Sequence, residues 1–71
     1  MSRDHKNLAI MLTAKRKEAE LTQANLAEAV QVSRKSINAI ENGIYVPSTV
    51  LALKIAKTLG CKVEDIFKLP T

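Results

Sequence analysis

The sequence predicts an all-α protein, a compact bundle of five helices in one domain. Its 71 residues leave room for a single small core. Apolar residues make up 46% of the chain and aromatic residues only 3%, so aliphatic side chains must fill this core, as is typical of a helical bundle. Apolar residues also recur at helical spacing, and the two glycines and two prolines fall outside the segments that show it.

The N-terminal part contains an arm and a first helix. Residues 1–6 mix charges without apolar periodicity, so we expect a flexible arm. A helix is predicted over residues 7–18, because Leu8, Met11 and Leu12 would share its inner face. Residues 7–71 then form one domain, because no repeat, linker or low-complexity tract interrupts them.

Residues 22–42 predict two short helices joined by a tight turn. Thr22 and Ser33 are candidate N-caps, because each offers a side-chain oxygen to unpaired N–H groups of a first helical turn. Between the two helices, Gln31 and Val32 leave room only for a sharp corner. Residues at helical spacing predict a shared core, namely Leu26, Ala27, Val30, Ile37 and Ile40.

The outer face of the second of these helices has the chemistry of base recognition. At about 100° per residue, one arc holds Arg34, Lys35, Asn38, Ala39 and Asn42. Arg or Lys can donate to guanine, Asn can pair bidentately with adenine, and Ala can contact a thymine methyl group. The same composition also fits the solvated polar face of an ordinary helical hairpin, so both interpretations stay open at this point.

Two further helices are predicted after this pair. Asn42 and Gly43 end the second helix, and Pro47 and Ser48 end the following loop and cap the next helix. That helix is predicted over residues 49–59, with an inner face of Ala52, Leu53, Ile55, Ala56 and Leu59. Gly60 closes it, and a short fifth helix is expected over residues 63–67.

The charge balance favours a polyanionic partner. The chain carries a formal net charge of +4 and has a pI near 9.5, which attracts it to phosphates and makes binding weaken steeply with salt.

Several spaced elements form one pattern, which comprises residues 12–16, Leu21-Thr22-Gln23, Leu26-Ala27, Val32-Ser33-Arg34, Ile37, Ile40-Glu41-Asn42-Gly43, Pro47-Ser48 and Ala52-Leu53-Lys54-Ile55-Ala56. This pattern resembles the Cro/CI-type helix-turn-helix family of phage and bacterial repressors, and most closely its stand-alone, single-domain members. The resemblance extends over residues 8–69. It implies a lambda-repressor-like fold that dimerises, binds a near-palindromic operator and regulates transcription.

The resemblance also assigns roles to individual residues. It implies base reading by Ser33, Arg34, Lys35, Asn38 and Ala39, which agrees with the face found from the helical angle. It implies phosphate contacts by Thr22, Gln23, Asn42 and Tyr45, which would set the register of the protein on DNA. Gln23 would in addition brace Arg34, because one amide can serve both partners.

An ion pair is a further implication of the resemblance. Arg16 and Glu41 match a pair that joins the first helix to the end of the recognition helix. The alternative is two solvated surface charges, which would contribute at most about 1 kcal/mol.

Three positions depart from the family pattern. Gln31 stands in the turn where Gly is common, so we expect mild strain there. Glu20 also replaces a frequent Gly, and Lys62 stands where a Ser commonly caps the last helix. Neither Glu20 nor Lys62 belongs to the predicted reading face.

The C-terminal region carries more apolar residues than a core of this size needs, which are Val63, Ile66, Phe67 and Leu69. The resemblance implies that they pair two copies of the chain, with the recognition helices about 34 Å apart, one turn of DNA. The alternative is that all four close the core of the monomer.

Other chemistry has little support. The single cysteine, Cys61, has no clustered His or Cys and cannot form an internal disulfide, so it indicates a small apolar filler in a reducing cytoplasm. His5 has no catalytic partner nearby in the sequence. The sequence therefore indicates no enzyme, metal site or cofactor. We also expect no membrane partner or small-molecule ligand, because no signal peptide, long apolar span or Gly-rich phosphate loop is present.

Two hypotheses follow. The first is a sequence-specific DNA-binding regulator of transcription, a repressor that occupies an operator as a homodimer with its third helix in the major groove. The alternative is a protein-interaction module on the same fold, with an antitoxin-like or adaptor role. The outer face of the third helix distinguishes them, because only the first hypothesis requires it to contact bases.

Overall fold

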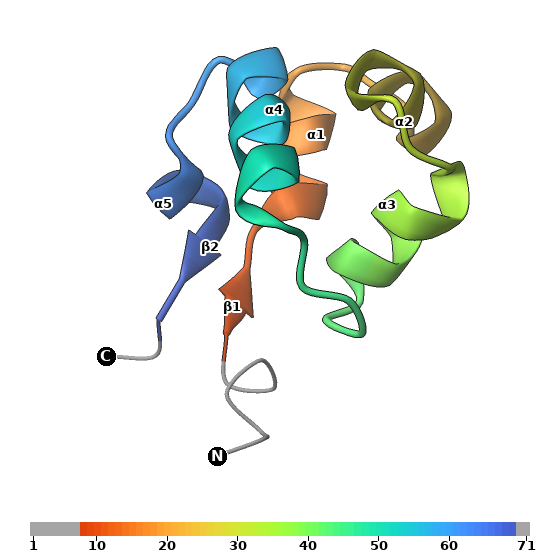
Figure 1. Ribbon diagram of the computed structural model, residues 1–71. Coiled ribbons are helices and arrows are strands. Elements are labelled where there is room, and N and C mark those ends of the chain that lie inside the picture. Colours follow the sequence, from red (N-terminus) through yellow and green to blue (C-terminus); the bar gives the residue numbers. More distant parts are fainter. Residues whose placement is uncertain (1–7, 70–71) are drawn as a thin grey trace.

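The computed structural model describes residues 8–69 (Figure 1). The expected arm, residues 1–6, lies outside this range. Five helices and two short strands follow one another along the chain in the order β1 (Ala9–Ile10), α1 (Leu12–Glu18), α2 (Gln23–Val30), α3 (Arg34–Glu41), α4 (Thr49–Leu59), α5 (Val63–Ile66) and β2 (Phe67–Lys68). The predicted five-helix bundle is therefore confirmed, with a small sheet added to it.

The first helix begins later than its periodicity predicts. It starts at Leu12 instead of residue 7, because residues 9–11 bond to the C-terminal end of the chain. Ile10 lies opposite Phe67 in the antiparallel pair β1–β2, and the Met11 N–H donates to the Ile66 carbonyl oxygen at 2.7 Å. Met11 is 42% exposed, so its predicted inward orientation is wrong, whereas Leu12 is fully buried.

Side-chain caps begin three of the helices where the sequence predicts. The Thr22 hydroxyl accepts from the Asn25 N–H at 3.0 Å, and the Asn25 side chain accepts from the Thr22 N–H at 3.1 Å. Ser33 accepts from the N–H of Ser36 at 3.1 Å at the start of α3. Ser48 caps α4 in the same way through the N–H of Leu51, also at 3.1 Å. These local bonds determine where the helices of the bundle start.

Within residues 8–69, two non-glycine residues adopt left-handed backbone conformations. Gln31 has φ 64° at the end of α2, and Glu20 has φ 61° after α1. These are the two positions where the family pattern commonly has Gly, which adopts this conformation without the cost that a Cβ adds. The turn between α2 and α3 still closes, because the Val32 N–H bonds to the Ala27 carbonyl oxygen at 2.9 Å.

Helix α5 begins without a side-chain cap from Lys62. Instead, the carboxylate of Asp65 accepts from the Lys62 N–H at 3.0 Å. This hydrogen bond, from the backbone of Lys62 to the side chain of Asp65, thus takes the place of the cap that a Ser would provide at position 62.

A single aliphatic core lies between the helices, and it contains Leu12, Leu26, Ala27, Val30, Ile37, Ile40, Leu51, Ile55, Ala56 and Ile66. All five inward-facing residues predicted on α2 and α3 are among them. On α4 the prediction is wrong at Leu53, which is 56% exposed, while Leu51 is buried in its place. Ala52 and Leu59 are half-buried.

The helices are arranged so that α3 and α5 lie on opposite sides of the bundle, with α4 and α1 between them (Figure 1). Helix α2 packs against both α3 and α4, and α5 packs against α4. The surface of α3 and the surface of α5 with β2 therefore face different sides of the molecule. Among residues 8–69, no helix is long and apolar enough to cross a membrane.

Candidate nucleic-acid interface

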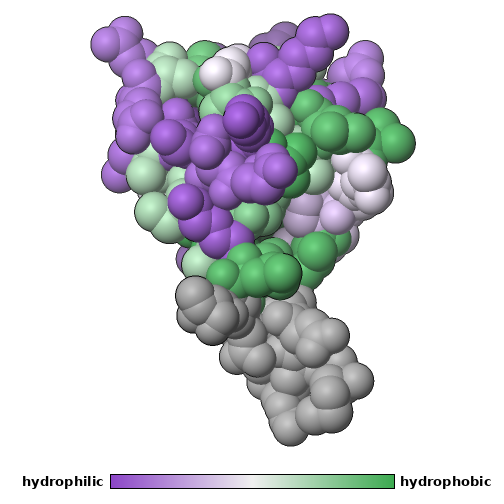
Figure 2. Space-filling model, turned by 90° about the vertical axis from the view of Figure 1, so that its left-hand side faces the viewer, coloured by the Kyte–Doolittle hydropathy of each residue, from purple (hydrophilic) through white to green (hydrophobic). Residues whose placement is uncertain are grey.

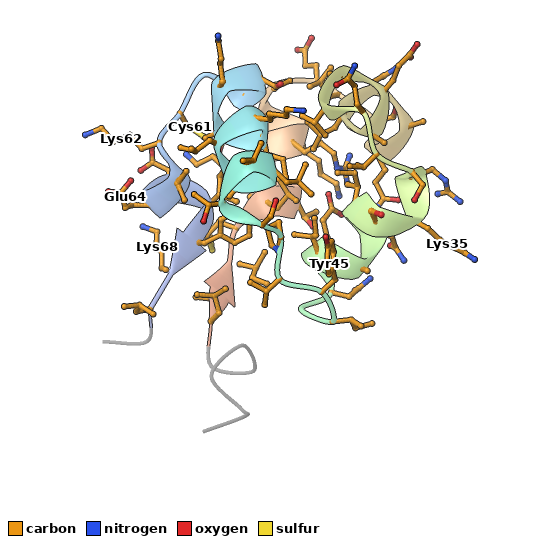
Figure 3. All side chains as sticks on the ribbon, in the orientation of Figure 1. Lys35, Tyr45, Cys61, Lys62, Glu64 and Lys68 are labelled. Atoms are coloured by element: carbon orange, nitrogen blue, oxygen red, sulfur yellow. The ribbon has the colours of Figure 1, made fainter. Side chains whose placement is uncertain are left out.

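Helix α3 carries its charged and amide groups on the surface. Ile37 and Ile40 are fully buried and anchor its inner side. Arg34, Lys35 and Asn38 are exposed on the outer side. Lys35 projects away from the bundle at the edge of the molecule (Figure 3). We name Ser33, Arg34, Lys35, Asn38 and Ala39 the reading face.

The two small residues of the reading face also have structural roles. Ser33 is exposed, but its Oγ atom caps α3 and lies 3.1 Å from the Oγ atom of Ser36. Ala39 is half-buried, and its carbonyl oxygen accepts from the N–H groups of Ile44 and Tyr45 at 2.9 and 3.3 Å. These backbone bonds hold the loop after α3 against the helix.

Gln23, the first residue of α2, lies beside the reading face. Its Oε1 atom accepts from the Arg34 Nη1 atom at 3.3 Å. Its Nε2 atom donates to the Asn38 Oδ1 atom at 3.2 Å and to the Glu41 Oε1 atom at 2.9 Å. The structure thus brings Gln23 next to Arg34, as the family resemblance implies, and also joins it to two residues that the sequence did not indicate as its partners.

Behind Gln23, an ion pair joins α1 to the end of α3. The Arg16 Nε atom lies 2.6 Å from the Glu41 Oε2 atom, and the two side chains are only 11% and 6% exposed. The Arg16 Nη2 atom donates to Glu41 Oε1 at 3.3 Å, and its Nη1 atom donates to the Leu21 carbonyl oxygen at 2.9 Å. The pair expected from the resemblance is present, and it is buried, unlike two solvated surface charges.

The ion pair keeps Glu41 ionised. Burial by itself would raise the pKa of the Glu41 carboxyl, but hydrogen bonds from Arg16, Gln23 and Thr13, together with the charge of Arg16, outweigh it. The pKa of Glu41 therefore lies below its ordinary value. An ionised carboxylate at this point can only accept hydrogen bonds.

The residues expected to meet phosphate surround the reading face. Thr22, Asn42 and Tyr45 are exposed, and Gln23 is half-buried. The Asn42 Nδ2 atom donates to the Asn38 carbonyl oxygen at 2.8 Å and to the Asn38 Oδ1 atom at 3.2 Å. Tyr45 stands in the loop that follows α3 (Figure 3). Phosphate contact by these four residues stays a prediction.

Gln23, Asn38 and Asn42 form a connected group that sequence reasoning missed, and we name it the amide cluster. The separation of four residues between Asn38 and Asn42 on one helix was a signal for one of its contacts. The contact from Gln23 on α2 depends on how the two helices cross.

The C-terminal surface lies on the other side of the bundle. Leu69 is 83% exposed, while Val63 and Phe67 are half-buried. Ile66 is fully buried in the core of this chain, so its expected place in a dimer interface is wrong. Ile66 belongs to the aliphatic core, against which α5 packs through its contact with α4.

An apolar groove of about 530 Å³ runs over this surface, and its lining includes Leu8, Val46, Ala52, Leu53, Val63 and Phe67. Figure 2 shows apolar residues gathered along the lower edge and right-hand side of the face that α5 presents. Lys62, Glu64 and Lys68 carry charges of both signs near α5 and β2 (Figure 3). The sequence indicated apolar residues in this region but not a groove.

Cys61 lies between α4 and α5. Burial raises the pKa of the half-buried Cys61 thiol, and the charge of Asp65 adds to this effect. In residues 8–69, no three His, Cys, Asp or Glu side chains come together as metal ligands would. His5 lies outside the described residues.

Comparison with known proteins shows to which family a chain with this geometry is similar. A family model described as "Helix-turn-helix" matches residues 12–66, from the start of α1 to the end of α5. An HTH-type transcriptional regulator of Methanocaldococcus jannaschii is 60% identical over 47 residues, which are 66% of this chain and 71% of that protein. The "ImmF control region 10 kDa protein" of Bacillus phage phi105 is 43% identical over 53 residues, which are 75% of this chain and 59% of that protein.

A solved structure shows the same arrangement of helices. The crystal structure of the clp gene regulator ClgR from Corynebacterium glutamicum superimposes with a TM-score of 0.75 at 28% sequence identity. The superposition covers 92% of this chain and 67% of that one. Residues 12–66, which the family model matches, include the whole of α3 and both residues of the Arg16–Glu41 ion pair.

Proposed function

This chain belongs to the helix-turn-helix family of transcriptional regulators, and we propose that it is a repressor that binds a near-palindromic operator as a homodimer. The observation that carries this proposal is the construction of α3. Buried Ile37 and Ile40 anchor its inner side, so the reading face stands free at the surface with its cationic and amide groups. A helix of this kind fits the major groove of DNA.

In the proposed complex, each residue type of the reading face has a distinct role. Arg34 and Lys35 donate to guanine O6 and N7, and the methyl group of Ala39 contacts a thymine methyl. Ser33 offers its hydroxyl group, whose oxygen accepts from the backbone of α3 and lies 3.1 Å from the Ser36 hydroxyl. Asn38 contributes a contact whose direction is argued in the next subsection.

Phosphate contacts fix the position of α3 in the groove. We assign them to Thr22, Gln23, Asn42 and Tyr45, which lie on α2 or just before it, at the end of α3 and in the loop after it. The net charge of +4 adds attraction that does not depend on sequence. Binding is therefore expected to weaken as counterions are added.

The groove near α5 is proposed to receive a second copy of the chain. Its apolar centre and the charges of Lys62, Glu64 and Lys68 around it resemble the core and rim of a protein interface. Val63, Phe67, Leu69 and the exposed Leu53 supply the apolar contacts. Because this surface and α3 lie on different sides of the bundle, pairing through it leaves both reading faces uncovered and available to two half-sites about 34 Å apart.

Repression then follows from occupancy. A dimer bound across an operator excludes other proteins from the same stretch of DNA. The name of the phage relative refers to a control region, and this supports a role in repression. The proposed activity involves no chemical step.

A selection from random duplexes, carried out at two salt concentrations, tests the proposal. We expect an enriched near-palindromic sequence whose affinity falls linearly with salt on a logarithmic scale. On that sequence, Arg34→Ala and Lys35→Ala should each weaken binding by about 1–3 kcal/mol. Lys57→Ala, which changes an exposed lysine on α4, is the matched control and should have little effect.

Two results would contradict the proposal. One is selection without any enriched sequence. The other is an equal loss of affinity in the Lys57→Ala control and in the two reading-face variants. If these variants instead abolish binding to a partner protein, the protein-interaction module becomes the better account.

A further inference from the structure

We infer that Asn38 reads its base as a hydrogen-bond donor only, because the amide cluster already occupies its side-chain oxygen. The inference rests on the proposed function, since it concerns how the reading face contacts DNA. It follows from the direction of each hydrogen bond in the cluster, and each direction is determined by a partner that can act in one way only.

The direction of the Gln23 amide is set at both of its ends. Glu41 is a carboxylate that only accepts, and it lies 2.9 Å from one polar atom of the amide. Arg34 is a guanidinium that only donates, and it lies 3.3 Å from the other. The NH₂ group of Gln23 must therefore face Glu41, and this same NH₂ group lies 3.2 Å from the Asn38 side chain. Glu41 is thus a positioning residue for the reading face.

The direction of the Asn42 amide is set by the backbone. One of its polar atoms lies 2.8 Å from the Asn38 carbonyl oxygen, which can only accept, so this atom belongs to the NH₂ group. The same NH₂ group lies 3.2 Å from the Asn38 side chain. Two donors, one from α2 and one from the end of α3, therefore point at Asn38.

Both donors approach the same atom, Asn38 Oδ1. A carbonyl oxygen has two lone pairs, and these two bonds use both of them. The Asn38 NH₂ group is turned away from the cluster, and within residues 8–69 it makes no hydrogen bond. Because Asn38 is exposed, this group is available to a base in the groove.

This arrangement changes the readout expected from an asparagine. Bidentate pairing with adenine needs an amide oxygen that accepts from the 6-amino group and an amide nitrogen that donates to N7. The oxygen of Asn38 is not free, so only the donor contact remains. The base atoms that suit it are acceptors at the major-groove edge: purine N7, guanine O6 or thymine O4.

A coupling experiment between Asn38 and single base atoms tests the inference. Within the selected half-site, each adenine is replaced in turn by purine, which lacks the 6-amino group. In parallel, each purine is replaced by its 7-deaza analogue, each guanine by 2-aminopurine, which lacks O6, and each thymine by 4-thiothymine. Binding of every duplex is measured with the wild-type protein and with Asn38→Ala.

We expect one acceptor atom whose loss weakens the wild-type protein by about 3- to 10-fold but leaves Asn38→Ala unchanged. Loss of any 6-amino group should affect both proteins equally. A 6-amino group coupled to Asn38, or no coupled acceptor at all, would overturn the inference while leaving the proposed function intact. Failure of the wild-type protein to select any sequence would instead overturn the proposed function, and the inference with it.

A second variant tests the role of the cluster itself. Gln23→Ala combined with Asn42→Ala removes both donors from the Asn38 oxygen. A change in phosphate contact at these two residues would affect all duplexes alike, so only the relative affinities are compared. In this variant, the affinity for a duplex with adenine at the Asn38-dependent position, relative to duplexes with the other bases there, should be about 3- to 10-fold higher than in the wild-type protein. Unchanged base preference would contradict the assignment of the lone pairs.

Discussion

The Arg16 Nε atom lies 2.6 Å from the Glu41 Oε2 atom, and this contact connects α1 to the last residue of α3. The same Glu41 side chain accepts from Gln23 through its other oxygen. A charge pair in the interior is thereby linked to the amides that border the reading face. The stability of the bundle and the proposed recognition of DNA therefore both involve one carboxylate.

Removing this carboxylate should destabilise the protein. In Glu41→Ala, the Arg16 guanidinium stays buried and keeps only its bond to the Leu21 carbonyl oxygen. Leaving a buried charge without its partner costs about 3 kcal/mol or more. Urea unfolding followed by circular dichroism measures the change. Glu28→Ala, at an exposed position on α2, is the control and should change the free energy of unfolding by less than about 0.5 kcal/mol.

The same group predicts how stability depends on pH. The pKa of Glu41 is below its ordinary value in the folded protein, so the unfolded chain binds the proton more readily. The contribution of Glu41 to stability is therefore complete above the ordinary pKa of about 4.5 and is lost as the pH falls through the lower, folded-state pKa.

In Glu41→Gln this group no longer titrates, so the free energy of unfolding should fall less steeply with decreasing pH below about pH 4.5. Urea titrations of wild-type and variant protein over this range provide the comparison. Parallel pH profiles would show that Glu41 has the same pKa in both states.

The left-handed turn residue offers a stabilising change. Gln31 has φ 64° and an exposed side chain, so Gln31→Gly removes backbone strain without removing a buried contact. We expect the free energy of unfolding to rise by about 0.5–1 kcal/mol. Glu28→Gly, in the interior of α2, should lower it by about 1 kcal/mol. Thermal melting of both variants tests these two expectations. A melting temperature of Gln31→Gly below that of the wild-type protein would show that Gln31 does not strain the turn.

The proposed dimer predicts that a charge introduced into the apolar groove weakens the association of two copies of the chain. Leu53 is 56% exposed, so Leu53→Glu leaves the core intact but puts a charge on the apolar surface. The dimer dissociation constant should increase by about 10-fold or more, because a buried leucine contributes about 1.5–3 kcal/mol.

Sedimentation equilibrium over a range of protein concentrations measures this constant. Thr58→Glu is the matched control, since Thr58 is exposed on the same helix but on a different face. A wild-type protein that stays monomeric at every concentration, or equal weakening by the control, would contradict the assigned surface.

The sequence by itself determined where α2, α3 and α4 start and which residues of α2 and α3 face inward. Thr22, Ser33 and Ser48 act within three residues of themselves, so their capping bonds depend on local chain geometry alone. The spacing of Ile37 and Ile40 likewise places both on one side of α3 whatever surrounds it. The family pattern additionally located the ion pair between Arg16 and Glu41.

Only the tertiary structure decided the features that depend on how distant segments meet. Pairing of residue 10 with residue 67 shortened α1, and no local signal reports such a contact. Helix α4 is apolar on most sides, so its periodicity could not show that Leu51 would be buried and Leu53 exposed. The direction of the Asn38 amide depends on two donors: Asn42, four residues further along at the end of the same helix, and Gln23, which only the crossing of α2 and α3 brings beside Asn38.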